Sequence, residues 1–478
     1  MWFRGKDLRI SDHAPLTSAL ETAEREGDVV TVFVLDPYFF AKTRAAELPH
    51  RMQFLLESLR SLEENVAHLG GRLLVVPGKS IDVVPALARD LAVDRVVAQS
   101  WTEPFARRRD KLVRERLTVP FDLFEGELLA PHGKVRTGSD GPFSVYTPFA
   151  RAFRRDVAIA PPLPAPKSLP SLGKEISALV AKKVRTTDVP KLSDLDLVEN
   201  ANLLRGGERA ARDRLAAFIA TKVAAYSDAR DMLAVAGTSR LSQDLKFGVL
   251  SPRTVWSSIV RSGTANTQGG IDKVTNELLW REFTHHILDA RPGLLEHPFR
   301  QGFEGFPWRE DDAAWEAWVA GKTGYPVVDA AARELFHDGY VHNRARMITA
   351  SFLTKHLLLS YRRGEAHFMK YLTDGDWAQN NAGWQWSAGC GVDAQPYFRV
   401  FNPVTQGQKF DPDGAYVKKW LPELEGLDAK VVHAPWEAPA LSLRGAGVTL
   451  GTTYPRPIVE HTFARDRFLK TAKQHLAQ

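Results

Sequence analysis

The chain is poor in the residues that cross-link proteins or hold metal ions. Its 478 residues include one cysteine, Cys390, which excludes an internal disulfide and any site built from several cysteines. Its fourteen histidines form no HExxH pattern or similar cluster, so we predict no metal centre. No stretch is long and apolar enough to span a bilayer, and the first residues lack the pattern of a secretory signal. These absences favour a cytoplasmic protein without a membrane segment.

The size and the charge of the chain indicate its domain organisation and the kind of partner it binds. A chain of 478 residues with 44% hydrophobic content is large enough for two or more domains with their own cores. The net charge is +6, and between residues 340 and 420 ten Lys or Arg stand against six Asp or Glu. Nine of the twelve tryptophans fall between Trp280 and Trp436. Basic charge interleaved with aromatic rings suits a polynucleotide partner. The alternative is a solvated basic face beside an ordinary core.

The first part of the chain predicts an α/β domain with a parallel, Rossmann-like sheet. β-Branched runs at residues 29–35, 73–76 and 95–98 predict strands, and the segments between them have helical spacing. Alternating strands and helices imply parallel strands with helical crossovers. One apolar stripe predicts a helix and contains Met52, Leu55, Leu56, Leu59, Leu62 and Val66. Residues 2–4 read as the end of a strand that starts abruptly, so either a few preceding residues are missing or the start is misassigned.

The remainder predicts a linker and an all-α domain. Residues 160–166 (APPLPAP) contain too many prolines for a helix or a sheet. Beyond residue 198 the apolar spacing is helical, without strand alternation or an internal repeat. We therefore predict an α/β domain at residues 1–126, a long irregular linker at 127–197 and a large helical domain at 198–478.

Residues 374–386 (DGDWAQNNAGWQW) are the most unusual segment. They place carboxylates, carboxamides and three indoles within thirteen residues. Acidic side chains are rarely buried without partners, and tryptophans supply large aromatic surfaces. The segment predicts a pocket for a flat aromatic ligand that also carries polar edges.

Residues 238–242 (TSRLS) follow Gly237 and predict a phosphate site. Three hydroxyls and a guanidinium stand near an expected helix start, where backbone N–H groups and the helix dipole favour an anion. The alternative is a plain Ser/Thr N-cap.

Two helical faces combine polar and apolar groups at i, i+3, i+4 spacing. They are formed by Glu277, Trp280 and Arg281, and by Asn343, Arg346 and Met347. Taken singly, each is equally consistent with an ordinary amphipathic helix. Arg346 has a candidate partner in a buried carboxylate such as Asp374.

Together these segments resemble the photolyase/cryptochrome family. The resemblance spans nearly the whole chain and includes residues 2–4 (WFR), 7–9 (DLR), 323–330 (TGYPVVDA), 397–403 (YFRVFNP) and 454–459 (YPRPIV). Motifs of this length in this order do not arise by chance. Within the family the chain is most similar to the class I enzymes that act on cyclobutane pyrimidine dimers.

The resemblance implies a bent FAD in the helical domain, active in its reduced anionic form. The matching cofactor positions are Tyr226, Thr238, Ser239, Arg240, Leu241, Ser242, Arg346, Asp374, Gly375, Asp376 and Asn380. Among them, Arg346 would pair with Asp374, and Asn380 would face flavin N5. A neutral amide at this last position resembles the repair enzymes, whereas plant and insect photoreceptors commonly carry Asp or Cys.

The resemblance also implies a DNA lesion site. The matching positions are Glu277, Trp280, Arg281, Asn343, Arg344, Met347, Trp386 and Lys409. Trp280 and Trp386 would clamp the flipped-out dimer, and Glu277 would hydrogen-bond a pyrimidine and steady its radical anion. Arg344 and Lys409 would contact phosphates. The (6-4) photolyases carry a catalytic His pair in the segment matching residues 341–347, where this chain instead resembles the dimer enzymes.

The implied activity is blue-light-dependent DNA repair, that of a carbon–carbon lyase. Light, absorbed directly or through a second chromophore in the α/β domain, drives an electron from the reduced flavin to the dimer, whose two cross-link bonds then break. The second chromophore, a methenyltetrahydrofolate or a deazaflavin, is undecided. Residues 50–51 and 101–104 lie where such ligands often contact the fold.

One departure from the family concerns the relay that carries electrons to oxidised flavin. The family usually uses three tryptophans, and the matching positions here are Trp384, Tyr361 and Trp308. A tyrosine must shed a phenolic proton of ordinary pKa ~10 to form a stable radical. We therefore expect slower photoreduction, or a detour through Trp377.

The expected substrate is damaged duplex DNA, bound by a monomer that needs no protein partner and acts in the cytoplasm, at the nucleoid if prokaryotic. Three alternatives remain. The first is a cryptochrome-type blue-light photoreceptor, against which Asn380 and the lack of a long polar tail after residue 459 argue. The second is a photolyase for (6-4) lesions or for dimers in single-stranded DNA. The third is a plain flavoprotein or nucleic-acid-binding module.

Overall fold

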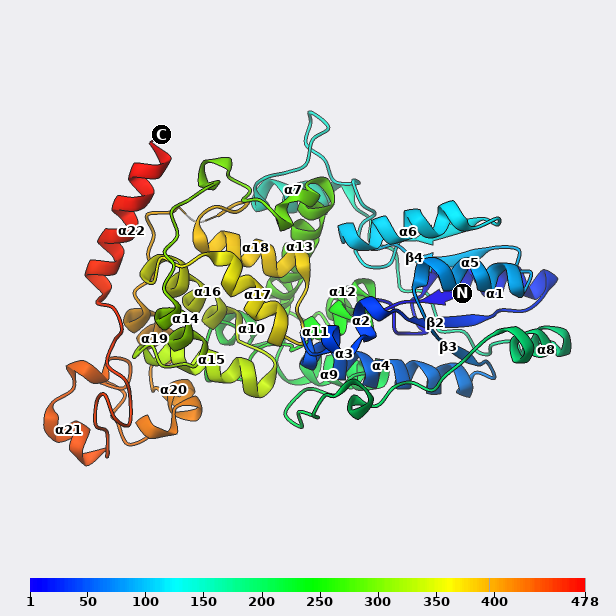
Figure 1. The fold of residues 1–478 in the computed structure, drawn as a ribbon. Coiled ribbons are helices and arrows are strands. Elements are labelled where there is room, and N and C mark those ends of the chain that lie inside the picture. Colours follow the sequence, from blue (N-terminus) through cyan, green and yellow to red (C-terminus); the bar gives the residue numbers. More distant parts are fainter. Residues whose placement is uncertain (395, 478) are drawn as a thin grey trace. The chain divides into compact units, whose positions relative to one another are not determined.

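The structure, a computed structural model, describes residues 1–394 and 396–477. The chain forms two compact units (Figure 1). Unit 1 comprises Met1–Ala224 and Ser239–Pro292, and unit 2 comprises Ala225–Thr238 and Gly293–Gln478. Residues 198–224 and 239–292 fall in the same compact unit as the α/β region. The predicted domain ranges 1–126, 127–197 and 198–478 stay a prediction.

Unit 1 contains the strands. They are β1 (Trp2–Phe3), β2 (Thr31–Leu35), β3 (Leu73–Pro77), β4 (Val96–Gln99) and β5 (Phe121–Phe124). β2 pairs in parallel with β1 and β3, and β4 pairs in parallel with β5. The predicted parallel α/β arrangement is confirmed. The sequence did not reveal β5, whose four residues include a charged Asp122.

Unit 1 also contains helices, and some of them share an apolar core with these strands. They are α1 (Ala14–Glu26), α2 (Pro37–Phe40), α3 (Lys42–Ala45), α4 (Pro49–His68), α5 (Ser80–Asp90), α6 (Pro104–Arg116), α7 (Tyr146–Asp156), α8 (Lys174–Lys183), α9 (Glu208–Thr221), α11 (Ser242–Lys246), α12 (Pro252–Arg261) and α13 (Gln268–Ala290). The predicted apolar stripe lies on α4 and is fully buried. The proline-rich stretch has no regular structure, but the predicted linker also contains α7 and α8.

Unit 2 is helical, as predicted. Its helices are α10 (Tyr226–Ala229), α14 (Asp312–Val319), α15 (Pro326–Asp338), α16 (Asn343–Ser351), α17 (Tyr361–Tyr371), α18 (Trp377–Ala388), α19 (Pro403–Phe410), α20 (Ala415–Trp420), α21 (Ala440–Gly445) and α22 (His461–Leu476). One continuous apolar core joins α14 to α18 and includes Trp318 and Trp384. Across the part of the chain that the structure describes, we find no helix whose length and apolar character would let it cross a bilayer.

Helix α18 explains why the segment at residues 374–386 folds as it does. Asp376 is its N-cap, and its carboxylate accepts from the N–H groups of Ala378 and Gln379 at 3.0 and 3.1 Å. The helix ends at Gly389, whose φ of 89° is readily available only to glycine. The predicted carboxylates therefore stand at the start of a helix, where its dipole favours negative charge.

Candidate active site

Arg346 and Asp374 form the predicted ion pair. The guanidinium Nη2 on α16 lies 2.9 and 3.1 Å from the two carboxylate oxygens of Asp374, and Nε donates to the carbonyl of Val341 at 2.7 Å. Burial alone would lower the pKa of Arg346, but the Asp374 carboxylate raises it, so the guanidinium stays charged. Nη1 takes no part in these bonds and can donate to a ligand. Gly375, between the two acidic residues, is buried.

Asn380 is held by a neighbour that the sequence did not reveal. Its Nδ2 donates to the backbone carbonyl of Glu365 on α17 at 3.1 Å. The adjacent Asn381 donates from Nδ2 to the Glu365 carboxylate at 3.0 Å. Burial raises the pKa of Glu365 to about 7, while the bond from Asn381 opposes that rise. The residue whose backbone holds the predicted flavin-facing amide thus also carries a titratable carboxyl group, which bonds the neighbouring Asn381.

The segment at residues 238–242 is not the plain N-cap that the alternative interpretation required. Helix α11 starts at Ser242 and has Leu241 at its N-cap, without a side-chain capping bond. Arg240 adopts a left-handed backbone with φ of 53°, and its carbonyl accepts from Gln243 Nε2 at 2.5 Å. Tyr226 and Thr238 belong to unit 2, whereas Ser239 and the residues after it belong to unit 1.

Helix α13 carries the predicted lesion contacts Glu277 and Trp280, both partly exposed. The indole of Trp280 stacks on the phenol of Tyr146, with ring centroids 3.7 Å apart and planes 7° apart. Arg281, predicted to contact DNA, is buried and donates to the carbonyl of Glu127 at 2.8 Å. Its burial argues for a role in holding α13 rather than in contacting a phosphate.

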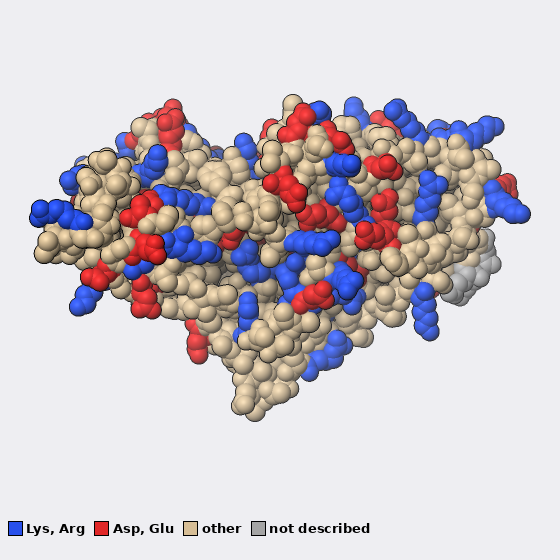
Figure 2. Space-filling view, turned by 90° about the horizontal axis from the view of Figure 1, so that it is seen from below, with Lys and Arg blue, Asp and Glu red and all other residues tan. Residues whose placement is uncertain are grey.

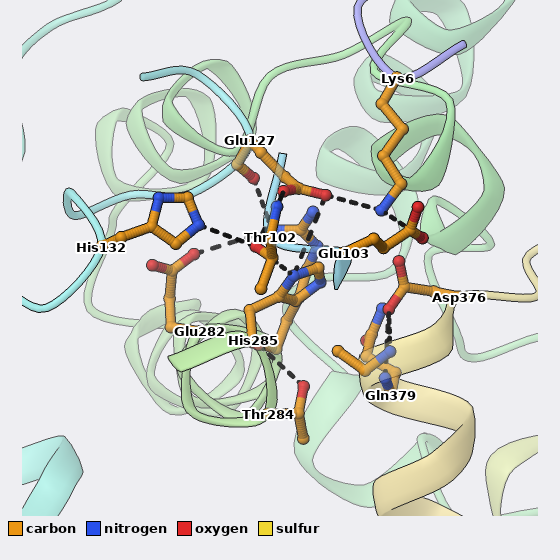
Figure 3. A network of polar contacts seen from close by, with 12 residues as sticks. Lys6, Thr102, Glu103, Glu127, His132, Glu282, Thr284, His285, Asp376 and Gln379 are labelled. Carbon is orange, nitrogen blue, oxygen red and sulfur yellow. Dashed lines mark hydrogen bonds and ion pairs between the residues drawn. The ribbon is translucent and has the colours of Figure 1, made fainter. Parts of the chain in front are cut away.

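A buried polar network supports this helix (Figure 3). Lys6 Nζ lies 2.7 Å from Glu127 and 2.9 Å from Glu103. Glu127 also accepts from the backbone N–H and the hydroxyl of Thr102 at 2.6 and 2.9 Å. Thr102 and Glu103 fall in the stretch predicted to contact a second chromophore, and both are buried within this network. The ring of Trp101 beside them is covered by the guanidiniums of Arg4 and Arg109. Residues 101–103 therefore belong to the core and present no open surface.

The carboxyl ends of β2 and β4 carry an aromatic group that the sequence did not reveal. Tyr38, just after β2, stacks on Phe105, just after β4, with centroids 4.1 Å apart and planes 12° apart. Phe39 meets Phe105 edge-on at 5.8 Å. Tyr38 is 44% exposed. Ligands of parallel sheets bind at this edge.

Helix α16 presents the predicted Asn343 and Met347 together. Asn343 is exposed, and its Nδ2 lies 3.8 Å from the sulfur of Met347. His342 is the N-cap of this helix, accepting from the N–H of Arg344 at 3.1 Å, and burial lowers its pKa to about 4. His342 therefore serves as a cap of α16, and burial favours its neutral form.

The predicted phosphate contacts differ in exposure. Arg344 is largely buried, 3.0 Å from Asp231 and over the ring of Phe410, whereas Lys409 is exposed. On the face drawn in Figure 2, basic and acidic side chains are interspersed, without a large area of one sign. Trp386, the second predicted clamp, is partly exposed on α18.

The predicted relay residues Trp384, Tyr361 and Trp308 belong to two separate sets of ring contacts in unit 2. Tyr361 is buried and lies 6.4 Å from Trp308 between centroids. Burial raises the pKa of Tyr361, and no described residue accepts its phenolic proton. Trp384 makes no ring contact with Tyr361 among the described residues, but its centroid lies 6.1 Å from that of Trp318, which stacks on Trp315 at 5.3 Å.

This second chain was missed by sequence reasoning, although Trp315 and Trp318 stand at i, i+3 spacing on α14. Trp318 is buried and Trp315 is partly exposed, with the Arg363 guanidinium 4.6 Å from its centroid. Ring contacts between tryptophans therefore connect buried Trp384 through Trp318 to the partly exposed Trp315. Trp377, the predicted detour, is 40% exposed at the start of α18; its role stays a prediction.

The residues of unit 2 fit FAD. A flavin is flat, has an apolar body and has polar edges that need both donors and acceptors. Unit 2 supplies an ionised guanidinium with Nη1 available, two buried carboxylates at a helix start and an oriented amide. In this arrangement Arg346, Asp374, Asp376 and Asn380 would hold the isoalloxazine ring.

Comparisons with known proteins agree with this geometry. Residues 1–167 match the model described as DNA photolyase, and residues 274–474 match the FAD binding domain of DNA photolyase. The chain is 39% identical over 474 residues to the deoxyribodipyrimidine photo-lyase of Agrobacterium fabrum, covering 98% of this chain and 96% of that protein.

Two solved structures are similar over nearly the whole chain. A bacterial class III photolyase from Agrobacterium tumefaciens aligns with a TM-score of 0.89 and 37% identity, covering 100% of this chain and 97% of the other. A cryptochrome of Synechocystis sp. PCC6803 aligns with a TM-score of 0.88 and 29% identity, covering 98% of each chain. The predicted class I assignment therefore stays a prediction, whereas the family is established: this chain belongs to the DNA photolyase family.

Proposed function

We propose that the protein is a deoxyribodipyrimidine photo-lyase that uses blue light to split cyclobutane pyrimidine dimers in DNA. The observation that carries the proposal is the pair Glu277 and Trp280 on α13. The two side chains are partly exposed and lie one helical turn apart, and the indole of Trp280 stacks on Tyr146. A flat lesion needs an apolar wall, and its carbonyl and N–H edges need a polar partner. The name of the Agrobacterium fabrum relative supports the same reaction.

Reduced FAD, when bound and excited by light, supplies the electron that opens the dimer. The protein's own groups supply position and electrostatics. Trp280 is proposed to give the lesion an apolar wall, and Glu277 to hydrogen-bond the pyrimidine as negative charge develops on it. Trp386 of unit 2 stays a predicted lesion contact. Asn380, fixed by the Glu365 carbonyl, offers the flavin a neutral partner that carries no acidic proton.

We propose that electrons reach oxidised flavin through Trp384, Trp318 and Trp315, with Tyr361 and Trp308 as a slower branch. The indole chain is continuous by ring contact and ends at a partly exposed residue. Oxidation of Tyr361 would require loss of a proton for which the described residues offer no acceptor.

We propose that a second chromophore binds beside Tyr38 and Phe105 in unit 1. This stack lies at the strand ends and is partly exposed, whereas the predicted residues 101–103 are buried. Methenyltetrahydrofolate and deazaflavin both stay open. Purified protein should show a second chromophore whose retention Phe105→Leu lowers while flavin content is unchanged; equal retention by this variant would contradict the location.

The partner is proposed to be duplex DNA with a pyrimidine dimer, bound by a monomer in the cytoplasm, at the nucleoid if the cell is prokaryotic. Exposed Lys409 and partly buried Arg344 are the proposed phosphate contacts. Buried Arg281 is not retained as one.

A second candidate function is that of a cryptochrome-type photoreceptor. The observation in its favour is the similarity to the Synechocystis cryptochrome. A receptor would undergo flavin photochemistry without restoring pyrimidine monomers. The neutral capping role of His342 gives no support to a (6-4) enzyme.

The deciding experiment is repair of a duplex that carries one defined thymine dimer, followed by chromatographic detection of restored thymines. We expect restoration under blue light and none in the dark. Glu277→Ala should lower repair at saturating DNA by about 10-fold or more. The matched control, Asp272→Ala, removes an exposed carboxylate from the same helix and should repair normally. Bound lesion without restoration under light would favour the receptor.

A further inference from the structure

The phenol ring of Tyr146 covers one face of the Trp280 indole. The ring centroids are 3.7 Å apart and the planes differ by 7°, so the two rings are in full contact. Tyr146 is buried, whereas Trp280 is partly exposed. An indole has two faces, and the phenol covers one of them.

Tyr146 is itself fixed to the helix that carries Trp280. Its hydroxyl donates to the Asn276 side-chain oxygen at 2.6 Å and lies 3.0 Å from the Asn276 carbonyl. Asn276 precedes Trp280 by one turn of α13, so phenol and indole are tied to the same turn. Phe283, one turn further, meets both rings edge-on at 5.9 Å. Burial raises the pKa of Tyr146, and the hydroxyl remains a donor.

We infer that Tyr146 is a positioning residue for lesion recognition: it holds the Trp280 indole in one orientation, so that the opposite face forms a preorganised wall for a flat pyrimidine dimer. The inference rests on the proposed role of Trp280. A partly exposed tryptophan without a stacked neighbour would sample several rotamers and lose that freedom on binding. Stacking removes this cost before the lesion arrives.

The expected effect is a loss of discrimination. An aromatic stack of this kind corresponds to about 3- to 10-fold in binding. Tyr146→Leu should therefore weaken binding of dimer-containing duplex by about 3- to 10-fold and leave binding of undamaged duplex unchanged. Tyr146→Phe keeps the stack but loses the bond to Asn276, and should fall between wild type and Tyr146→Leu.

The test measures dissociation constants of both duplexes in the dark for flavin-loaded wild type, Tyr146→Leu, Tyr146→Phe, Trp280→Leu, Phe149→Leu and the double variant Tyr146→Leu/Trp280→Leu. Phe149→Leu is the matched control, because Phe149 lies on the same helix α7 and packs on Phe283 and His286. Thermal unfolding of Tyr146→Leu and Phe149→Leu separates loss of folding from loss of discrimination. Tyr146→Phe provides a milder variant should Tyr146→Leu fail to fold.

If Tyr146 acts through Trp280, the double variant discriminates no worse than Trp280→Leu alone. An additional loss in the double variant would mean that Tyr146 contacts DNA itself and would overturn the inference. So would an equal loss of discrimination in Phe149→Leu, or unchanged discrimination in Tyr146→Leu while Trp280→Leu loses it. If the wild-type protein bound both duplexes equally, that result would contradict the proposed function itself, and the inference about Tyr146 would fail with it.

Discussion

A side chain on Gly364 would overlap the six-membered ring of Trp384. Helices α17 and α18 thus approach at a separation that only glycine permits at this position. Trp384 is held on its other sides by Phe368, edge-on at 5.1 Å, and by Trp318 at 6.1 Å. The position of Trp384, the first residue of the proposed relay, therefore depends on the absence of a side chain at Gly364.

Gly364→Ala should therefore displace Trp384 and destabilise the protein by about 1–3 kcal/mol, the usual cost of overpacking a core. Denaturant unfolding of the flavin-loaded protein measures this. Gly383→Ala is the control, because Gly383 lies in α18 with no atom close to an added Cβ, and alanine there should stabilise by up to ~1 kcal/mol. Equal effects of the two substitutions would contradict the packing argument.

Photoreduction should depend more on Trp318 than on Tyr361. Trp318→Phe breaks the indole chain, whereas Tyr361→Phe removes a group that has no described acceptor for its proton. The loss of oxidised-flavin absorbance under light, with a reductant present, should slow in Trp318→Phe and change little in Tyr361→Phe. Electron paramagnetic resonance should detect a tryptophan radical in the wild type. Trp420→Phe, a buried indole elsewhere in unit 2, is the control. The opposite ranking of the two variants would place the relay on Tyr361.

Features that depend on the periodicity of apolar residues or on motifs shared with a family can be predicted from the sequence, and these features cover much of the fold. Parallel strands, the α4 stripe and the Arg346–Asp374 pair follow from periodicity, charge and motif. Glu365 and Tyr146 could not be predicted in the same way. Glu365 lies in a helix of ordinary sequence, and its pKa is raised by burial in the folded protein. Tyr146 falls in a predicted linker, and its contact with Trp280 joins helices that are distant in sequence.

Sequence motifs also do not show which side chains are buried in the core. Arg281 shares a helical face with Glu277 and Trp280, which made it a predicted DNA contact. A helical wheel gives the direction of a side chain but not its burial. Arg281 is buried and donates to the carbonyl of Glu127, which lies between β5 and α7. Spacing alone cannot distinguish a guanidinium that faces DNA from one that holds the chain together.

Stability should fall as pH rises from about 4.5 to about 7, and Glu365 should contribute to that fall. Its pKa is raised from 4.5 to about 7 by burial, so the folded protein holds the proton more tightly than the unfolded chain does. The stabilisation is fully present below the pKa of the unfolded chain. It is lost as the pH rises through the pKa of the folded protein, and the total loss is up to about 3 kcal/mol. Glu365→Gln keeps the acceptor for Asn381 and cannot ionise.

The free energy of unfolding of Glu365→Gln should therefore match wild type near the acidic end and exceed it above pH ~7. Buried Glu282, whose pKa is also raised to about 7 by burial, contributes in the same direction, so the difference between the two proteins is the quantity to measure. Glu296→Gln, at an exposed position, serves as control. A constant offset between wild type and Glu365→Gln at every pH would show that ionisation of Glu365 is not the cause.

Binding to DNA should weaken with salt in proportion to the phosphates contacted, and Lys409 should account for about one of them. Lys409 is exposed, so its ammonium can reach a phosphate without breaking a buried contact. Lys409→Ala should weaken dimer-containing and undamaged duplex alike and reduce the slope of log affinity against log salt by about 1. Lys470→Ala, exposed on α22, is the control and should leave the slope unchanged. Discrimination between the two duplexes should survive in Lys409→Ala, because a phosphate contact carries no information about the lesion. A selective loss of binding to the dimer-containing duplex would instead place Lys409 at the lesion itself.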